Sequence, residues 1–146
     1  MARITRWISI TERCAMIYRM QAFNEIQLPA CQHMYIYYLC SHSDGISQDM
    51  LAKKVYVNKS NVARNIKSLE DAGYVYREVD SEDKRAFKVY PTSKAFDVLP
   101  FIKEKMSIFN EEIMKDFSES EKELLEKMLI KVAQNASSYI NDNYEE

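Results

Sequence analysis

The stretch that decides the fold is residues 47–90, SQDMLAKKVYVNKSNVARNIKSLEDAGYVYREVDSEDKRAFKVY. In its first half the apolar residues recur at helical spacing, which predicts two short helices separated by a tight turn. Ser47 and Asn58 precede these helices and are expected to cap them, because their side-chain oxygens can accept hydrogen bonds from free backbone N–H groups. The second helix is expected to run from Lys59 to Ala72 and to end at Gly73.

After this helix the period of the pattern changes to two. Residues 75–79 and 87–90 alternate between two sets of side chains, which predicts the two strands of a hairpin. The link between them, residues 80–85, is highly charged and lacks a tight-turn dipeptide such as Asn-Gly, so a projecting loop is expected. The fold class expected is mainly α with a small β-hairpin, in which residues 28–92 form a winged helix-turn-helix lobe.

Helical periodicity also marks the segments on both sides of this lobe. Ile4–Ile26 is expected to be one long helix, and Pro29–Ser41 a second that is apolar nearly all round and therefore buried. A later helix contains Pro100, which removes a hydrogen bond, so a kink near Val98 is expected. Ser118–Glu121 has the capping-box pattern that begins a last helix.

Composition and charge limit the class of protein. The chain has 146 residues with only two Gly and three Pro, which favours a single, mainly helical chain over a β-sandwich. It shows no apolar run that spans a bilayer and no signal peptide, so a cytoplasmic protein without a membrane partner is expected. The net charge is −2, yet Lys53–Lys94 holds ten Lys or Arg against six Asp or Glu, a net of +4. A basic centre in an acidic chain is typical of a nucleic-acid contact.

The helix after Asn58 carries its polar residues on one face. Its other face is apolar, so it can pack on the lobe while it presents donors and acceptors to a DNA major groove. Arg64 can bind guanine with two hydrogen bonds, and Asn61 can pair with adenine. The charged loop can reach phosphates or the narrow minor groove. The candidate DNA-binding residues are therefore Lys59, Ser60, Asn61, Arg64, Asn65, Lys67 and Ser68 on the helix, and Asp83, Lys84 and Arg85 on the loop.

Three segments of this stretch resemble the MarR family of bacterial and archaeal transcription regulators. Gln48–Val55 is similar to the family's "xxLAxxL" helix, Ser60–Arg77 to its "xxVTRxVxxLExxGLVxR" recognition segment, and Asp80–Arg85 to its "DxxDxR" wing. The resemblance implies that Asp83 positions the wing loop and that Arg85 enters the minor groove.

The two ends of the chain are expected to form a dimer. Residues 1–27 and 93–146 carry large apolar side chains that a compact central lobe can cover only in part, namely Trp7, Ile17, Phe23, Leu125, Met128 and Tyr139. The resemblance implies the same role for these helices within a single MarR-like chain, residues 1–146. A two-fold homodimer places its reading helices about 34 Å apart, so the expected partner is double-stranded DNA with a pseudo-palindromic operator. Pro91–Ala95 stands where the family has "LTxxG" and keeps only the threonine. This difference bears on the angle between the DNA-binding lobe and the dimer helices.

The sequence thus predicts a homodimeric, sequence-specific DNA-binding transcriptional regulator, a repressor that responds to a small phenolic or other aromatic ligand. The candidate ligand-binding residues are Trp7, Tyr18, His33 and Tyr37. A first alternative is a thiol-based redox-sensing regulator that uses Cys14, which lies in the first helix as the sensing cysteine does in one branch of the family. A buried structural thiol is the simpler interpretation of this residue. A second alternative is a winged-helix protein-interaction module without DNA binding, which the overall acidity favours.

Enzymatic, cofactor and metal functions are not expected. The chain has neither a Gly-rich phosphate loop nor a nucleophile motif. Cys31 and His42 are eleven residues apart on one expected helix and cannot share a metal ion.

Overall fold

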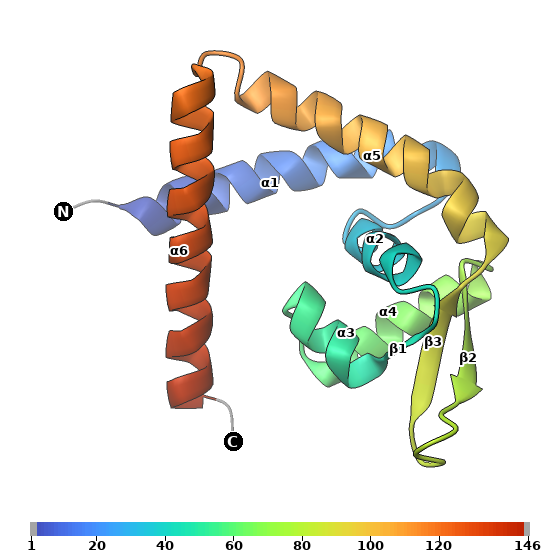
Figure 1. Cartoon of the computed structure of the whole chain (residues 1–146). Coiled ribbons are helices and arrows are strands. Elements are labelled where there is room, and N and C mark those ends of the chain that lie inside the picture. The colour runs from blue at the N-terminus through green and yellow to red at the C-terminus, as the bar shows by residue number, and fades with distance from the viewer. Residues whose placement is uncertain (1–2, 145–146) are drawn as a thin grey trace. The chain divides into compact units, whose positions relative to one another are not determined.

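The computed structural model describes residues 3–144, and the chain divides into two compact units between Ser107 and Ile108. The elements drawn in Figure 1 are, in chain order, α1 (Ile4–Ala22), η1 (Asn24–Ile26), α2 (His33–Ser41), β1 (Ile46–Ser47), α3 (Gln48–Val55), α4 (Lys59–Asp71), β2 (Val75–Val79), β3 (Phe87–Pro91), α5 (Ser93–Ile113) and α6 (Glu119–Tyr144). Within the described residues the fold is therefore six α-helices with a small antiparallel sheet, and the predicted winged-helix class is confirmed.

The helix-turn-helix has the caps that the sequence predicts. The Ser47 hydroxyl accepts a hydrogen bond from the Met50 N–H at 3.1 Å, and Asn58 Oδ1 accepts one from the Asn61 N–H at 2.9 Å. Gly73 follows α4 with φ of +79°, a conformation in which most side chains are strained. Local sequence signals therefore fix both ends of the recognition helix, α4.

The sheet has one more strand than the sequence predicts. The expected hairpin is present as β2 and β3, in which Val75 pairs with Pro91 and Val79 with Phe87. The strand β1 then joins the other edge of β3, where Ile46 pairs with Val89. A strand of two residues is too short to show an alternating pattern, which is why the sequence did not indicate it.

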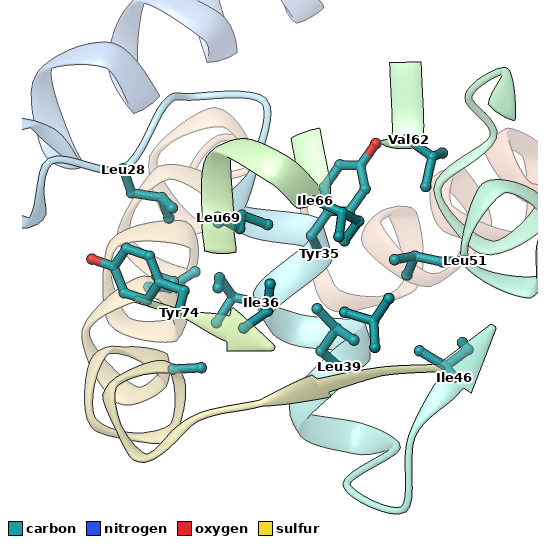
Figure 2. Packing of buried hydrophobic residues seen from close by; sticks show 14 of the residues in the cluster. Leu28, Tyr35, Ile36, Leu39, Ile46, Leu51, Val62, Ile66, Leu69 and Tyr74 are labelled. Carbon is teal, nitrogen blue, oxygen red and sulfur yellow. The ribbon is translucent and has the colours of Figure 1, made fainter. Parts of the chain in front are cut away.

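Buried side chains from the helices and the sheet form one core in this lobe (Figure 2). Its largest contributors include Tyr35, Ile36 and Leu39 on α2, and Val62, Ile66 and Leu69 on α4, and Figure 2 shows these side chains converging. Each fully buried side chain of this size contributes about 1.5–3 kcal/mol through the hydrophobic effect. This core fixes which face of α4 points inward.

The first two helices are shorter than the sequence predicts. The expected helix Ile4–Ile26 is wrong at its end, because α1 stops at Ala22 and the left-handed Gln27, with φ of +51°, reverses the chain after η1. The expected start at Pro29 is also wrong, because Pro29 accepts a 2.8 Å hydrogen bond from the Gln32 N–H in a separate turn before α2.

The helix α2 is also less buried than its apolar composition suggests. Met34 and Tyr37 lie on an exposed face. The expectation that this helix is buried therefore holds for the face that packs against the core and is wrong for the face that carries Met34 and Tyr37.

The helix α5 continues through Pro100 as one α-helix. Figure 1 shows its axis changing direction between the first turns and the remainder, as the sequence predicts for an interior proline.

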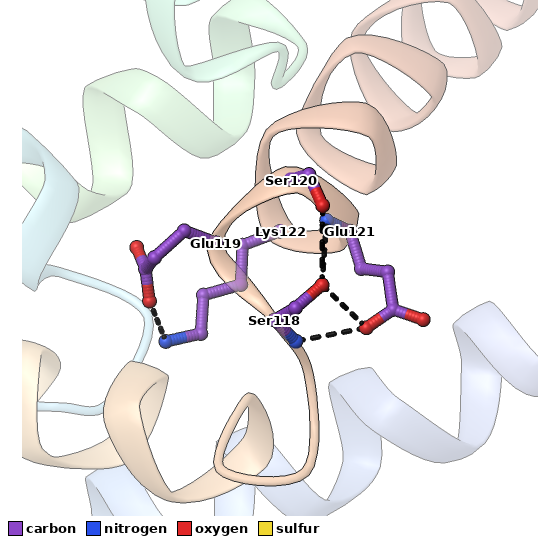
Figure 3. Close-up of polar contacts among 5 residues, drawn as sticks. All are labelled: Ser118, Glu119, Ser120, Glu121 and Lys122. Carbon is purple, nitrogen blue, oxygen red and sulfur yellow. Dashed lines mark hydrogen bonds and ion pairs between the residues drawn. The ribbon is translucent and has the colours of Figure 1, made fainter.

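The second unit begins at Ile108 and contains the end of α5 and the whole of α6. The predicted capping box opens α6: the Ser118 N–H donates to Glu121 Oε2 at 2.8 Å, and the Glu121 N–H donates to Ser118 Oγ at 3.4 Å (Figure 3). Among the described residues, no helix has the length and apolar character needed to cross a bilayer.

Candidate nucleic-acid interface

The outer face of α4 presents the side chains that the sequence predicts there. Arg64 and Ser68 are exposed, on the side opposite the buried apolar stripe. Lys67 is exposed and pairs with Asp71 at 2.5 Å, one turn further along the helix. Exposed ion pairs contribute little to stability, so Lys67 can exchange this partner for a phosphate at small cost.

The first turn of α4 is organised around Asn58. Its Oδ1 atom accepts the Ser60 hydroxyl at 2.9 Å in addition to the Asn61 N–H. Lys59 extends from the same turn and pairs with Asp49 of α3 at 3.2 Å, with both side chains exposed. The Asn58 cap therefore holds the backbone at the start of the recognition helix, while the ammonium group of Lys59 remains accessible.

Asn65 differs from the other predicted residues of α4 because its amide points toward α2. Its Nδ2 atom donates to Asn61 O at 2.9 Å and to Tyr35 Oη at 3.3 Å. Its Oδ1 atom accepts a hydrogen bond from Gln32 Nε2 at 3.1 Å. No sequence pattern indicated a role for Gln32 or Tyr35, because helical periodicity does not show which side chains of two separate segments meet.

The hairpin of β2 and β3, here called the wing, extends away from the helices of the lobe (Figure 1). At its tip, Asp83 Oδ1 accepts the Arg85 N–H at 3.0 Å, and Asp83 O accepts the Ala86 N–H at 2.9 Å. Asp80 closes the loop through its own N–H, which donates to Ala86 O at 2.9 Å. Asp83 thus shapes a turn that leaves the side chains of Lys84 and Arg85 exposed.

Two sets of contacts hold the C-terminal end of α4. Arg77 of β2 donates from Nη2 to Glu70 Oε2 at 2.7 Å, and these hydrogen bonds hold the pKa of the Glu70 carboxyl below its usual value. From the start of α5, Lys94 Nζ donates to Ala72 O at 2.6 Å and Thr92 Oγ1 donates to Gly73 O at 2.7 Å. Thr92, the one residue of the family's "LTxxG" segment that this chain keeps, therefore helps to join the end of α4 to the start of α5.

Two basic residues that were not among the predicted DNA-binding residues precede α4 in the chain. Lys53 and Lys54 occupy the last turn of α3 and are exposed. Both were counted among the basic residues of Lys53–Lys94. Their position just before the turn into α4 is the feature of the sequence that could have identified them as candidate DNA contacts.

The predicted ligand-binding residues lie on two helices, α1 and α2. Trp7 and Tyr18 are eleven residues apart on α1, which separates them by about 16 Å. Tyr18 donates its hydroxyl to Lys105 O at 2.8 Å, whereas Trp7 is exposed and lies beside the Arg6 guanidinium.

The other two predicted ligand-binding residues lie on α2 and face different surroundings. His33 is buried and its Nδ1 atom lies 2.9 Å from Ala30 O, and burial lowers the pKa of the imidazole. Tyr37 is half-exposed and packs edge-on against Tyr38. The open hollow on α1 contains none of the four predicted residues, since it is lined by Thr5, Arg6, Ser9, Ile10 and Arg13.

The three cysteines are free thiols. Cys14 is exposed, so the interpretation as a buried structural thiol is wrong; its side chain lies on the outer face of α1. Cys31 is also exposed, and Cys40 is partly buried, which raises the pKa of its thiol. Within residues 3–144 no three His, Cys, Asp or Glu side chains are grouped as metal ligands.

Comparisons with known proteins agree with this architecture. The sequence model of the MarR family matches residues 26–86. A relative in Bacillus subtilis, the uncharacterised helix-turn-helix transcriptional regulator YybA, is 29% identical over 113 residues, which cover 77% of this chain and 75% of that protein.

Solved structures extend the similarity to nearly the whole chain. The crystal structure of the transcriptional regulator SlyA is 30% identical with a TM-score of 0.87, over 94% of this chain and 96% of that one. A putative MarR family regulator from Listeria monocytogenes, crystallised with 26mer DNA, is 26% identical with a TM-score of 0.89, over 100% and 99% of the two chains. The recognition segment, the wing and these similarities together show that the chain belongs to the MarR family of transcriptional regulators.

Proposed function

We propose that the protein is a homodimeric, sequence-specific DNA-binding regulator that inserts α4 into the major groove and the wing into the adjacent minor groove. The observation that carries this proposal is the outer face of α4, which is polar, exposed and followed by a wing whose tip presents Lys84 and Arg85. The similar Listeria regulator was crystallised with DNA, which supports the same partner here.

The residues of α4 divide into base readers and phosphate contacts. Arg64 is exposed at the centre of the outer face and is suited to guanine, whose two acceptors match a guanidinium. Asn61 is placed one turn earlier and is suited to adenine. The phosphate contacts are assigned to the remaining exposed polar residues of the helix, Lys59, Ser60, Lys67 and Ser68. Asn65 is not assigned to DNA, because its amide already bonds within the lobe.

The wing supplies a second, electrostatic contact. The minor groove of A·T-rich DNA is narrow and carries a strong negative potential that attracts arginine. Arg85 is assigned to this groove, with Asp83 holding the turn and Lys84 contacting a phosphate. Both reading elements thereby act on one DNA segment.

The proposed dimer uses residues 1–27 and 93–146, and residues 28–92 form the DNA-binding lobe. Large apolar side chains are exposed along α1 and α6 in the single chain, among them Ile4, Trp7, Ile17, Met20, Leu124, Met128 and Tyr139. Apolar surface of this extent is typical of an interface that a second copy covers. A two-fold dimer then fits a pseudo-palindromic operator in the cytoplasm, with half-sites about 34 Å apart.

Regulation by a ligand that reduces DNA affinity is the second part of the proposal, and it gives the protein the role of a repressor. A dimer bound across a promoter blocks transcription, and an aromatic ligand that prefers another arrangement of the lobes releases it. Trp7 and Tyr18 lie about 16 Å apart along α1, so the proposed ligand site includes the partner chain's helices as well as Trp7, Tyr18, His33 and Tyr37.

The test begins with selection of bound sequences from a random DNA pool. We expect enrichment of a two-fold symmetric site, and an affinity for it that falls steeply as the salt concentration rises. Arg85→Ala should then lower affinity by about tenfold, since a groove contact of this kind contributes ~1–3 kcal/mol. Lys115→Ala is the matched control, because Lys115 is an exposed cation of the second unit that pairs with Glu112. Equal affinities of the two variants would remove the wing from the mechanism.

Two outcomes would favour other functions. If no sequence is enriched and the protein is not retained on heparin or DNA, the net charge of −2 points to a protein-interaction module. If peroxide lowers DNA affinity in the wild type but not in Cys14→Ser, the exposed Cys14 thiol is a redox sensor.

A further inference from the structure

A polar network joins the recognition helix to the start of α2. Asn65 of α4 receives a hydrogen bond from Gln32 Nε2 at 3.1 Å and donates one to Tyr35 Oη at 3.3 Å. The same Nδ2 atom donates to Asn61 O at 2.9 Å, so the amide is held on three sides. These contacts fix the side chain of Asn65 in one orientation.

The two partners of Asn65 are Tyr35 of α2 and Gln32, which directly precedes that helix, and both are buried. Gln32 is 4% exposed and Tyr35 is 2% exposed. A buried polar group left without a partner is costly, so Gln32 and Tyr35 each favour the position of α4 that keeps Asn65 within reach. A side shift or rotation of α4 would break these bonds.

The remaining contacts between α4 and the core are of a different kind. Val62, Ile66 and Leu69 are fully buried, and apolar burial depends on contact area and hardly on direction. Hydrogen bonds weaken steeply when their angle or length changes. The apolar stripe therefore sets which face of α4 packs on the lobe, whereas the polar network adds directional contacts that set the exact rotation of the helix about its own axis.

The rotation of α4 decides where its outer face points. Arg64 precedes Asn65 by one residue, which places it about 100° around the helix, and Asn61 is bonded to Asn65 through its carbonyl. A fixed Asn65 thus fixes the direction from which both proposed base readers leave the helix. An error of 1 Å is enough to break a two-bond contact with a base.

We propose that Gln32, Tyr35 and Asn65 are positioning residues that set the rotation of α4 for discrimination between DNA sequences. This inference rests on the proposed DNA-binding function. In this proposal Asn65 contributes to specificity without contacting a base, because it fixes the direction of the proposed base readers Asn61 and Arg64.

The decisive variant is Tyr35→Phe, which removes one oxygen atom from a side chain that cannot touch DNA. The matched control is Tyr74→Phe, because Tyr74 is equally buried and its hydroxyl donates to Ile26 O at 2.7 Å, away from the side chains of α4. Each variant is measured for affinity to the selected operator and to random DNA of the same length, at several salt concentrations, together with its thermal unfolding.

We expect Tyr35→Phe to lower the ratio of operator to random affinity by about fivefold, the size of one lost hydrogen bond. Its affinity for random DNA and its salt slope should match the wild type, because no phosphate contact is removed. Tyr74→Phe should lose thermal stability and keep the wild-type ratio. Gln32→Met, which keeps side-chain length without hydrogen bonds, should reproduce the Tyr35→Phe result.

The outcomes separate this inference from the proposed function. If the wild type does not prefer its selected operator over random DNA, the proposed function fails and the inference fails with it. If the wild type shows the preference but Tyr35→Phe and Gln32→Met keep the full ratio, the network is only structural and the inference alone is overturned.

Discussion

Glu70 in the last turn of the recognition helix and Arg77 in the first strand of the wing form a two-point ion pair across seven residues. Arg77 Nη2 lies 2.7 Å from Glu70 Oε2, and Arg77 Nε lies 3.4 Å from Glu70 Oε1. The planar guanidinium matches the carboxylate in this geometry, which a lysine cannot reproduce. The pair connects the two elements that are proposed to read the DNA.

This pair should give the stability a specific pH dependence. The pKa of the Glu70 carboxyl is lowered by Arg77 in the folded state, so the pair stabilises the fold above the ordinary value of 4.5. The stabilisation is lost as pH falls through the lowered pKa. Arg77→Met should therefore be less stable than the wild type near neutral pH, and the difference should vanish in acid. Urea unfolding across this range measures it, and a difference that does not change with pH would contradict the assignment.

His33 should make the lobe sensitive to mild acid. Burial lowers the pKa of its imidazole, with Arg19 adding to this effect while the Ala30 carbonyl and Glu12 oppose it. Below the ordinary value of 6.5 the unfolded chain takes up a proton that the folded chain refuses, so stability falls as pH drops from 6.5 toward the lowered pKa.

We expect His33→Gln to remove this part of the pH dependence. The measurement is the free energy of unfolding in urea at several pH values between neutral and the carboxyl range. A wild-type slope retained in the variant would show that other groups produce it.

The capping box at the start of α6 should contribute measurably to the second unit. Ser118 Oγ accepts the Glu121 N–H, and Ser118→Ala leaves that N–H without its side-chain partner. The expected loss is about 1 kcal/mol of unfolding free energy, the usual value for an N-cap. Ser120→Ala is the control, because the Ser120 hydroxyl lies 3.2 Å from Ser118 Oγ and caps no backbone group among the described contacts. Equal losses in the two variants would argue against the cap.

The apolar stripe of α6 should be required for the dimer. Leu124 and Met128 are each 54% exposed in the single chain and lie one helical turn apart. Converting both to Lys would bury two charges in the proposed interface, which is strongly unfavourable. Light scattering during gel filtration should show the mass of one chain instead of two. Glu126→Lys, an exposed position of the same helix, tests whether added charge alone has this effect, and a dimer that persists in the double variant would place the interface elsewhere.

The features that the sequence predicted correctly are those with local causes. Ser47, Asn58 and Ser118 cap helices whose first turns lie within three residues of them, and the apolar stripe of α4 follows from spacing alone. The strand β1 depends on pairing with Val89, far along the chain, and two residues carry no pattern. The orientation of Asn65 likewise depends on Gln32 and Tyr35, whose partners only tertiary packing decides.

The start of the expected helix Pro29–Ser41 shows the same distinction. Pro29 is compatible with the first position of a helix, which is why the sequence predicts a helix start there. The backbone instead forms a turn in which Pro29 O accepts the Gln32 N–H, and this turn places Gln32 beside α4. A boundary error of four residues therefore hid the polar network.

The contacts of Lys94 and Thr92 with the carbonyls of Ala72 and Gly73 have a mechanical consequence. The two carbonyls that directly follow α4 are bonded to residues at the base of α5, so these hydrogen bonds tie the end of α4 to the start of α5. Pro100 lies outside these bonds, two turns further along α5. A change in the bend of α5 at the proline therefore leaves the attachment of α4 to the base of α5 unchanged.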